Sequence, residues 1–476
     1  MSGRRPLGAL VAVLLLAGCT SFAEGGDGAD EPVAAAPTTP ADPSACPAER
    51  TAPDPDRPVL DYDFRLSDDL RTVTGSETVV FTPDVPTGEL VFRLLPNAPE
   101  SAPAGHRLAV DGVIGDDVED AGYEDAAGAD PGGLYVVRLS DDLGAGESTE
   151  VRLDFTLTVG EGGFERFGTA EGVTWWASGA PLLAWEPGVG WARDPFVGLT
   201  GETATSPAAD TTVTVSAPEA LTVLMTGRQA PPSEPRDGRR TWRSAEPVAR
   251  DVAVAAGEFE TAERETPGGV RVRAGALIDG DLEPARLLDD TVAAVSELET
   301  FLGPFPYETL TVALLPDYGG GIEYPSMILQ ATPSRDVLVH EVAHMWFYGM
   351  VGNSQFRDPW LDEAFATWAE AVPDPPPARV LGSLLESDGE VGGAMDEFDG
   401  DGPYVRTVYG KGGAALLAAR DAAGVDAFDT AIRCYVDATA WSIATPADVG
   451  AALADLPAAV DVLVRAGALD EDDVPR

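Results

Sequence analysis

The sequence predicts a multidomain α+β protein, with an antiparallel β-sandwich-like domain followed by a domain of mixed helices and strands. Residues 58–260 contain repeated runs of β-branched residues, often alternating with polar ones and separated by Gly, Pro and Asp. This pattern is typical of antiparallel strands. From about residue 261 apolar residues recur at helical spacing. A run of strands followed by helices is typical of an α+β chain or of separate packed domains.

The first 18 residues resemble a bacterial lipoprotein signal peptide. Arg4 and Arg5 precede a short apolar run, and small residues lead to Cys19. The resemblance implies cleavage before Cys19, a lipid on its thiol, and a place at the extracytoplasmic face of the cell membrane. The apolar run, about 11 residues, is shorter than the roughly 20 that span a bilayer. Residues 19–57 are rich in Gly, Ala, Asp, Pro and Thr, which predicts a disordered tether.

The chain is strongly acidic, with 80 Asp and Glu against 31 Lys and Arg and a net charge of −49. Such a surface repels nucleic acid, so we expect no nucleic-acid partner. Two explanations stay open: a general acidic bias of the source proteome, or adaptation to high salt, which screens self-repulsion. If Cys19 carries a lipid, Cys46 and Cys434 remain of the three cysteines. We hypothesise that they form a disulfide that pins the tether to the second domain.

In the second domain the expected elements follow from local signals. Residues 282–302 show the apolar spacing of a helix, and 309–315 and 327–329 that of strands. Ser334 is a candidate N-cap of a helix that runs to about Val351. Asp358 and Pro359 suit the N-cap and N1 positions of a further helix. An acidic, Gly-rich stretch at 116–133 is expected to loop out of the first domain, and His106 is expected at the surface.

A metal-binding pattern lies in these last two helices. The chain has three histidines, and two of them, His340 and His344, are four residues apart. On a helix this spacing places both imidazoles on one face. After eighteen intervening residues, Glu363 can supply a third ligand from the next helix. Two His and one Glu with a free fourth position form the ligand set of a hydrolytic zinc site, and Glu341 can face a water there. We therefore expect one Zn²⁺ per chain.

These residues, with three other segments, resemble the aminopeptidase N family of zinc metallopeptidases, within the gluzincin group. The segments are Gly320-Gly321-Ile322-Glu323-Tyr324, Tyr409-Gly410-Lys411-Gly412, and Trp185-Glu186 ahead of Ala192-Arg193. Ile322, Tyr324 and Ala184 depart from the family's Met, Asn and Gln. The resemblance implies that residues 261–476 form a thermolysin-like catalytic domain with short C-terminal helices. The large C-terminal helical domain of many members is not expected, because the chain ends soon after Tyr409.

The resemblance also implies a role for each residue. Glu341 would be the general base and Tyr409 the donor to the oxyanion. Lys411, the only lysine of the chain, strengthens the match at Tyr409. Glu323 and Glu186 would bind the α-ammonium group of a peptide with a free N-terminus. Gly320 and Gly321 would let the substrate backbone pair along the strand edge without obstruction by side chains.

Two other functions fit parts of this pattern. An endopeptidase of thermolysin type shares the zinc signature and needs neither Glu323 nor Glu186. A non-catalytic lipoprotein that binds peptides or cell-wall material could carry a structural zinc. Structural zinc sites usually have four protein ligands, and the sequence indicates three. The sequence therefore favours an aminopeptidase over both alternatives.

Overall fold

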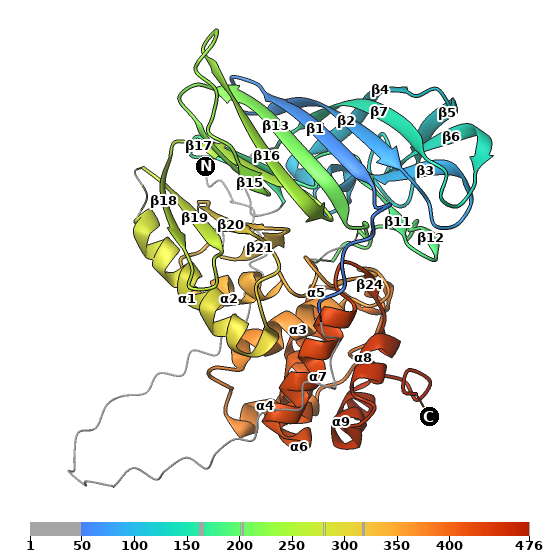
Figure 1. The fold of residues 1–476 in the computed structure, drawn as a ribbon, viewed down its shortest axis with the longest axis vertical. Helices are drawn as coiled ribbons and strands as arrows, with labels where there is room; N and C mark the ends of the chain where they lie inside the picture. Colours follow the sequence, from blue (N-terminus) through green and yellow to red (C-terminus); the bar gives the residue numbers. More distant parts are fainter. Residues whose placement is uncertain are drawn as a thin grey trace, which may run out of the picture.

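The computed structural model describes residues 49–160, 166–199, 201, 204–278, 280, 282–316 and 319–475. It has a β-rich unit and a second unit that combines one sheet with most of the helices (Figure 1). This is the α+β architecture that the sequence predicts. In the described part of the chain, no helix has the length and apolar character needed to cross a membrane. The predicted signal peptide and Cys19 lie outside the described residues.

The β-rich unit holds the strands of residues 59–257. They are β1 (Val59–Leu66), β2 (Thr72–Phe81), β3 (Thr87–Arg93), β4 (Arg107–Ile114), β5 (Val118–Glu124), β6 (Leu134–Leu143), β7 (Thr149–Thr158), β8 (Phe167–Ala170), β9 (Val173–Ala177), β10 (Leu182–Leu183), β11 (Trp185–Glu186), β12 (Gly190–Trp191), β13 (Ala209–Pro218), β14 (Thr222–Met225), β15 (Arg228–Gln229), β16 (Arg239–Ala249) and β17 (Ala253–Gly257). The largest sheet has the order β15-β16-β13-β1-β2-β7-β4. Two four-stranded sheets, β10-β3-β6-β5 and β14-β17-β9-β8, accompany it.

Alternation along the strands builds the core of this unit. In β1 every second side chain is buried, so one face of the strand packs inward. The pairings are antiparallel, as predicted, except that β1 runs parallel to β13. Aromatic residues such as Phe64, Phe155 and Trp176 meet in the core with edge-on ring contacts.

The second unit begins at β18 (Phe259–Glu265). Its five-stranded sheet has the order β18-β19-β20-β22-β21, with β19 (Arg271–Leu277), β20 (Thr309–Leu314), β21 (Gly321–Tyr324) and β22 (Met327–Gln330). Helix α1 (Pro284–Leu302) buries apolar residues at helical spacing and packs against β18 and β19. Strand β21 is an edge strand, antiparallel to β22. It therefore leaves one edge free beside the helices.

The helices of the second unit follow this sheet in the chain. They are α2 (Arg335–Ala343), α3 (Trp360–Ala371), α4 (Ala378–Leu385), α5 (Asp401–Tyr404), the π-helical segment η5 (Val405–Lys411), α6 (Gly412–Ala423), α7 (Val425–Ala438), α8 (Pro446–Ala452) and α9 (Pro457–Ala466). A short parallel pair, β23 (Gly352–Asn353) with β24 (Ile443–Ala444), joins the loop after α2 to the segment after α7.

The two units share a buried apolar layer. Trp175, Leu224 and Phe259 pack in one cluster with Met327 and Leu329 from the five-stranded sheet. The edge strand β21 lies next to β22, the strand that contains Met327 and Leu329 (Figure 1). This layer is a direct apolar contact between the two units.

Four local predictions were wrong. The helix that starts after Ser334 ends at Ala343, where a turn with Tyr348 at φ 80° replaces the expected extension to Val351. Residues 118–124 form β5 rather than a loop, because they pair with β6. His106 is buried, since Phe167 covers its ring. The predicted tether to residue 57 is ordered from Arg50 onward, where Arg50 and Thr51 bind the end of α7.

Candidate active site

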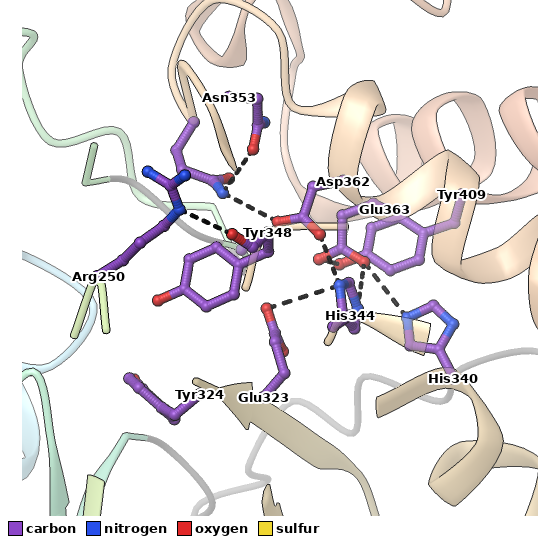
Figure 2. Close-up of polar contacts among 12 residues, drawn as sticks. Arg250, Glu323, Tyr324, His340, His344, Tyr348, Asn353, Asp362, Glu363 and Tyr409 are labelled. Carbon is purple, nitrogen blue, oxygen red and sulfur yellow. Dashed lines mark hydrogen bonds and ion pairs between the residues drawn. The ribbon is translucent and has the colours of Figure 1, made fainter. Parts of the chain in front are cut away.

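The two site histidines, His340 in α2 and His344 at its C-cap, project toward one point. His340 and His344 are one helical turn apart, and their ring centroids lie 4.8 Å from each other. The Nε2 atom of His340 lies 3.3 Å from Oε2 of Glu363, and Nε2 of His344 lies 3.5 Å from the same oxygen. Both imidazoles therefore face one carboxylate oxygen, as Figure 2 shows.

Helix α3 supplies that carboxylate. It starts after Pro359, which takes the N-cap position in place of Asp358, and Glu363 lies in its first turn. Aromatic side chains of α3, including Trp360, Phe365 and Trp368, are buried and fix the helix against α2. Burial alone would raise the pKa of Glu363, but the hydrogen bonds from His340 and His344 outweigh it and lower that pKa.

The arrangement fits a divalent metal ion. One ligand atom from each of His340, His344 and Glu363 lies within 4.8 Å of the others, and all three residues are largely buried. Two imidazoles and one carboxylate, with no fourth protein ligand in this group, match a zinc site that keeps a position open for water or substrate. The described residues thus bring the three predicted ligands together at one point.

Two further carboxylates border the same point. Glu341 on α2 and Glu323 on β21 each have an oxygen within 4.8 Å of a nitrogen of His344. Burial raises the pKa of Glu323 to about 8 and that of Glu341 to about 7. Oε1 of Glu323 and Oε2 of Glu341 are buried and have no hydrogen-bond partner among the described residues. Buried acceptors of this kind suit a cationic or proton-donating ligand.

Gly321 makes room for Glu341. A Cβ atom added to Gly321 would lie 2.5 Å from both Cγ and Oε1 of the Glu341 side chain. No side chain could occupy that position without moving the carboxylate. Gly320 lies just outside β21, and its carbonyl accepts a hydrogen bond from the amide of Ala331 at 2.8 Å.

Tyr409 reaches the site from η5. Its hydroxyl donates a hydrogen bond of 2.5 Å to Oε1 of Glu363, and its ring stacks at 6.0 Å from the ring of His340. Burial and the charge of Glu363 raise the pKa of Tyr409 well above its ordinary value. The hydroxyl therefore stays protonated at neutral pH and remains a donor.

Part of this site matches a known protein family. Residues 323–373, which contain Glu323, both histidines and Glu363, match the peptidase family M1 domain. This segment of the chain is therefore similar to the M1 peptidase family. It is 26% identical over 237 residues to aminopeptidase M1-A of Oryza sativa subsp. japonica, covering 42% of this chain and 27% of that protein. Aminopeptidase M1 of Arabidopsis thaliana is 24% identical over 238 residues, covering 42% of this chain and 27% of that protein. The chain therefore matches only about a quarter of the length of these relatives.

Solved M1 structures share the fold. The M1 zinc metallopeptidase from Deinococcus radiodurans superposes with a TM-score of 0.63 at 20% identity, over 86% of this chain and 93% of that one. A mutant of an M1 zinc metallopeptidase from the same organism, bound to a Tyr-Ser-Ala substrate, also gives a TM-score of 0.63 at 20% identity. This superposition covers 86% of this chain and 94% of that one. The similarity extends over both units of the chain.

Glu186 lies apart from the other predicted residues of this M1 site. It is buried on β11, and both its carboxylate oxygens accept hydrogen bonds from Nη2 of Arg357. It is not in either group of side chains that could hold a metal ion. Lys411 also points elsewhere: its Nζ donates to the carbonyl of Gly389 at 2.6 Å, so it fixes a turn beside η5.

Sequence reasoning assigned no role to the residues behind the M1 metal ligands. Asp362 accepts from Nδ1 of His344 at 2.5 Å, and Glu370 lies 3.3 Å from Nδ1 of His340. A carboxylate on Nδ1 fixes the tautomer and aims Nε2 at the metal position. One signal was present: Glu370 follows Glu363 by seven residues, which is two helical turns along the same face.

Proposed function

We propose that this chain is a zinc-dependent aminopeptidase that removes N-terminal residues from peptides. The observation that carries the proposal is the meeting of His340, His344 and Glu363 at one buried point, with the carboxylate of Glu341 beside them. The similarity of residues 323–373 to the M1 peptidase domain supports it, because the similar proteins are named as aminopeptidases and zinc metallopeptidases. One Zn²⁺ per chain fits the three ligands.

The chemistry divides between the metal and the chain. His340, His344 and Glu363 would hold a Zn²⁺ that, when bound, would lower the pKa of a water ligand toward about 7 and polarise the substrate carbonyl. Glu341 accepts a proton from the attacking water and passes it to the leaving amine. Burial raises the pKa of Glu341, which favours uptake of a proton by its carboxylate. The Tyr409 hydroxyl, which lies against Glu363, donates to the oxyanion as it forms.

Glu323 gives the reason for cleavage at the N-terminus. Its Oε1 is buried, has no hydrogen-bond partner among the described residues and lies 4.0 Å from Nδ1 of His344. It would accept from the α-ammonium group of the substrate and so fix which peptide bond is cleaved. The edge strand β21 and its Gly321 receive the substrate backbone. A structure of an M1 relative bound to a Tyr-Ser-Ala substrate is consistent with short peptides as substrates.

The decisive experiment removes the base and keeps the metal. Purified Glu341→Gln should hold one zinc per chain and lose at least about 10²-fold in the hydrolysis of aminoacyl fluorogenic substrates. Glu246→Gln, a matched change of a buried glutamate on β16, should leave hydrolysis intact. Full activity in Glu341→Gln would refute the mechanism. Equal cleavage of a peptide and its N-acetylated form would favour an endopeptidase.

We also propose that the chain is held at the extracytoplasmic face of the cell membrane by a lipid on Cys19. The Arg4-Arg5 segment, the short apolar run and the small residues before Cys19 support this. Cys19→Ser in cells should release the protein from the membrane fraction into the soluble fraction. Retention of Cys19→Ser in the membrane fraction after a high-salt wash would refute a lipid anchor at this residue.

A further inference from the structure

An arginine of the β-rich unit lies buried against the loop that follows the metal-binding helix. Arg250, between β16 and β17, donates from Nε to the carbonyl of Tyr348 at 3.0 Å and from Nη2 to that of Met350 at 3.2 Å. It also donates to the carbonyl of Ser206 at 3.0 Å and to that of Ser442 at 2.6 Å. Burial lowers its pKa to about 10, so the guanidinium stays charged at neutral pH.

These contacts fix the backbone of residues 348–353. The guanidinium lies so close to Gly352 that a Cβ added there would be 2.4 Å from Cζ of Arg250. The remaining cavity between Arg250, Asn353 and Gln355 has a volume of about 10 Å³. That is space for about one water.

The fixed loop presents two amides to the metal site. Nε2 of Gln355 donates to Oδ1 of Asn353 at 3.0 Å and to Oδ2 of Asp362 at 2.9 Å. Nδ2 of Asn353 donates to the carbonyl of Asp358, just before α3. The backbone amide of Gln355 donates to Oγ1 of Thr205, a second contact from the β-rich unit. Both N–H groups of the Gln355 side chain are thus engaged, and its orientation is determined.

Asp362 connects Gln355 to His344, one of the metal ligands, through its two carboxylate oxygens. With Oδ2 held by Gln355, its Oδ1 accepts from Nδ1 of His344 at 2.5 Å. The series from Arg250 through Asn353, Gln355 and Asp362 to His344 is buried, and no member is more than 3% exposed. In Figure 2, Asp362 lies between Asn353 and His344, and Arg250 lies to the left of them, beside Tyr348.

We infer that Arg250 and Gln355 are positioning residues for the metal, which act through Asp362 to hold the imidazole of His344 in its binding orientation. The inference rests on the proposed zinc site. It means that the β-rich unit, through Arg250 and Thr205, helps to set the metal affinity of the other unit. In metal sites the partners behind a ligand typically change affinity by about 10–100-fold when removed.

The test measures zinc affinity, by competition with a chromophoric chelator, in the full chain. Gln355→Glu keeps the side-chain shape, removes both donors and sets a second carboxylate against Asp362. We expect its zinc dissociation constant to rise by about 10–100-fold. Adding Asp362→Asn to Gln355→Glu restores a donor–acceptor pair and should recover part of the loss, a rescue that general damage to the fold would not give.

Arg250→Met tests the contribution of the other unit. We expect weaker zinc binding than in the wild type, and a matched control, Arg93→Met, should bind zinc as the wild type does. Arg93 is equally buried, and its contacts are the Asp194 carbonyl and the Phe196 ring.

If Arg250→Met does not fold, the zinc affinities of the Gln355 variants test the inference. Wild-type zinc affinity in Gln355→Glu, at an unchanged metal-free melting temperature, would overturn the inference. Failure of the wild type to bind zinc would instead refute the proposed function.

Discussion

The carboxylate of Glu186 is held by the guanidinium of Arg357, whose Nη2 donates to both of its oxygens, at 2.6 Å for Oε2. Arg357 lies in the turn before α3, and the pair connects β11 of the β-rich unit to the start of the helix that carries Glu363. Charge-assisted hydrogen bonds to arginine already satisfy this carboxylate. The finding places Glu186 at the junction of the two units, whereas Oε1 of Glu323 has no hydrogen-bond partner among the described residues.

The first prediction separates these two carboxylates. Glu323→Gln should lower kcat/KM for a free peptide by about 10–100-fold, because a hydrogen bond to a charged group contributes roughly 1.5–3 kcal/mol. Glu186→Gln should change it by less than about fivefold, since its carboxylate faces Arg357. The ratio of kcat/KM for a free peptide to that for its N-acetylated form is the measurement. Equal collapse of this ratio in both variants would assign ammonium binding to both residues.

The second prediction concerns the space beside the general base. Gly321→Ala would place a methyl group 2.5 Å from the Glu341 side chain, so the carboxylate must move. We expect kcat to fall by about 10²-fold, as misplacement by about 1 Å can cost that much. The zinc content should stay at one per chain, because the three ligands are not displaced.

A matched glycine provides the control for this change. Gly122 lies in β5, and an added Cβ there meets no atom within 4 Å. Gly122→Ala should therefore retain full activity. A Gly321→Ala enzyme with wild-type kcat would mean that Glu341 needs no fixed position, which argues against its role as base.

The third prediction isolates the hydroxyl of Tyr409. Tyr409→Phe keeps the ring that stacks on His340 and removes the donor, so kcat should fall by about 10²–10³-fold. Zinc affinity should hardly change, because the hydroxyl contacts Oε1 of Glu363 while the imidazoles face Oε2. Tyr435→Phe, at a buried hydroxyl with no partner among the described residues, is the control and should be nearly silent. A Tyr409→Phe enzyme with the kcat of the wild type would exclude the role of this hydroxyl as donor to the oxyanion.

Local spacing was enough to predict the centre of the site. Two histidines at i and i+4 meet on any helix, and the apolar pattern of 282–302 predicted α1. The α+β class followed from the change of pattern near residue 260. These features depend on residues close in sequence, where the geometry of a helix or strand is almost fixed.

The partners of the site could not be predicted in this way. Arg250 lies 98 residues from Tyr348, and Glu186 lies 171 residues from Arg357. Such contacts are set by how the two units pack, which periodicity does not encode. His106 shows the same limit: its polar neighbours in sequence predicted exposure, and packing against Phe167 buried it.

The fourth prediction concerns the segment after the tether. Arg50 pairs with Asp437 at 2.9 Å, and Oγ1 of Thr51 donates to the carbonyl of Ala438, both at the end of α7. Cys434 on α7 is disulfide-bonded, and the other two cysteines, Cys19 and Cys46, lie outside the described residues. We expect Cys46 to be the partner, because Cys19 is the proposed lipid site and Cys46 is four residues from Arg50.

Peptide mapping without reduction should recover a peptide that joins Cys46 to Cys434. Reduction should lower the unfolding temperature, since a crosslink closing a long loop contributes roughly 2–5 kcal/mol. Hydrolysis at 25 °C should be unaffected, because the disulfide attaches to α7, and none of the metal ligands lies on that helix. Alkylation of Cys46 in the unreduced protein would contradict this pairing.

The fifth prediction uses the buried histidine of the β-rich unit. Nδ1 of His106 accepts from the amide of Gly160 at 3.0 Å, and burial lowers its pKa to about 4. In the unfolded chain its pKa is about 6.5. Above pH 6.5 the ring is neutral in both states and its contribution to stability is complete. As the pH falls from 6.5 toward 4, the unfolded chain takes up a proton that the folded one does not, so stability is lost.

The contribution of His106 to the free energy of unfolding can be measured as a function of pH. A pKa difference of this extent corresponds to about 3 kcal/mol at the acid end of the window. His106→Gln removes the titration, so the wild type's stability advantage over the variant should shrink by up to that amount between pH 7 and pH 4. Urea unfolding of both proteins at several pH values measures the difference, in which the titration of the metal-site histidines cancels. A difference that stays constant with pH would mean that His106 titrates alike in both states and is not enclosed as described.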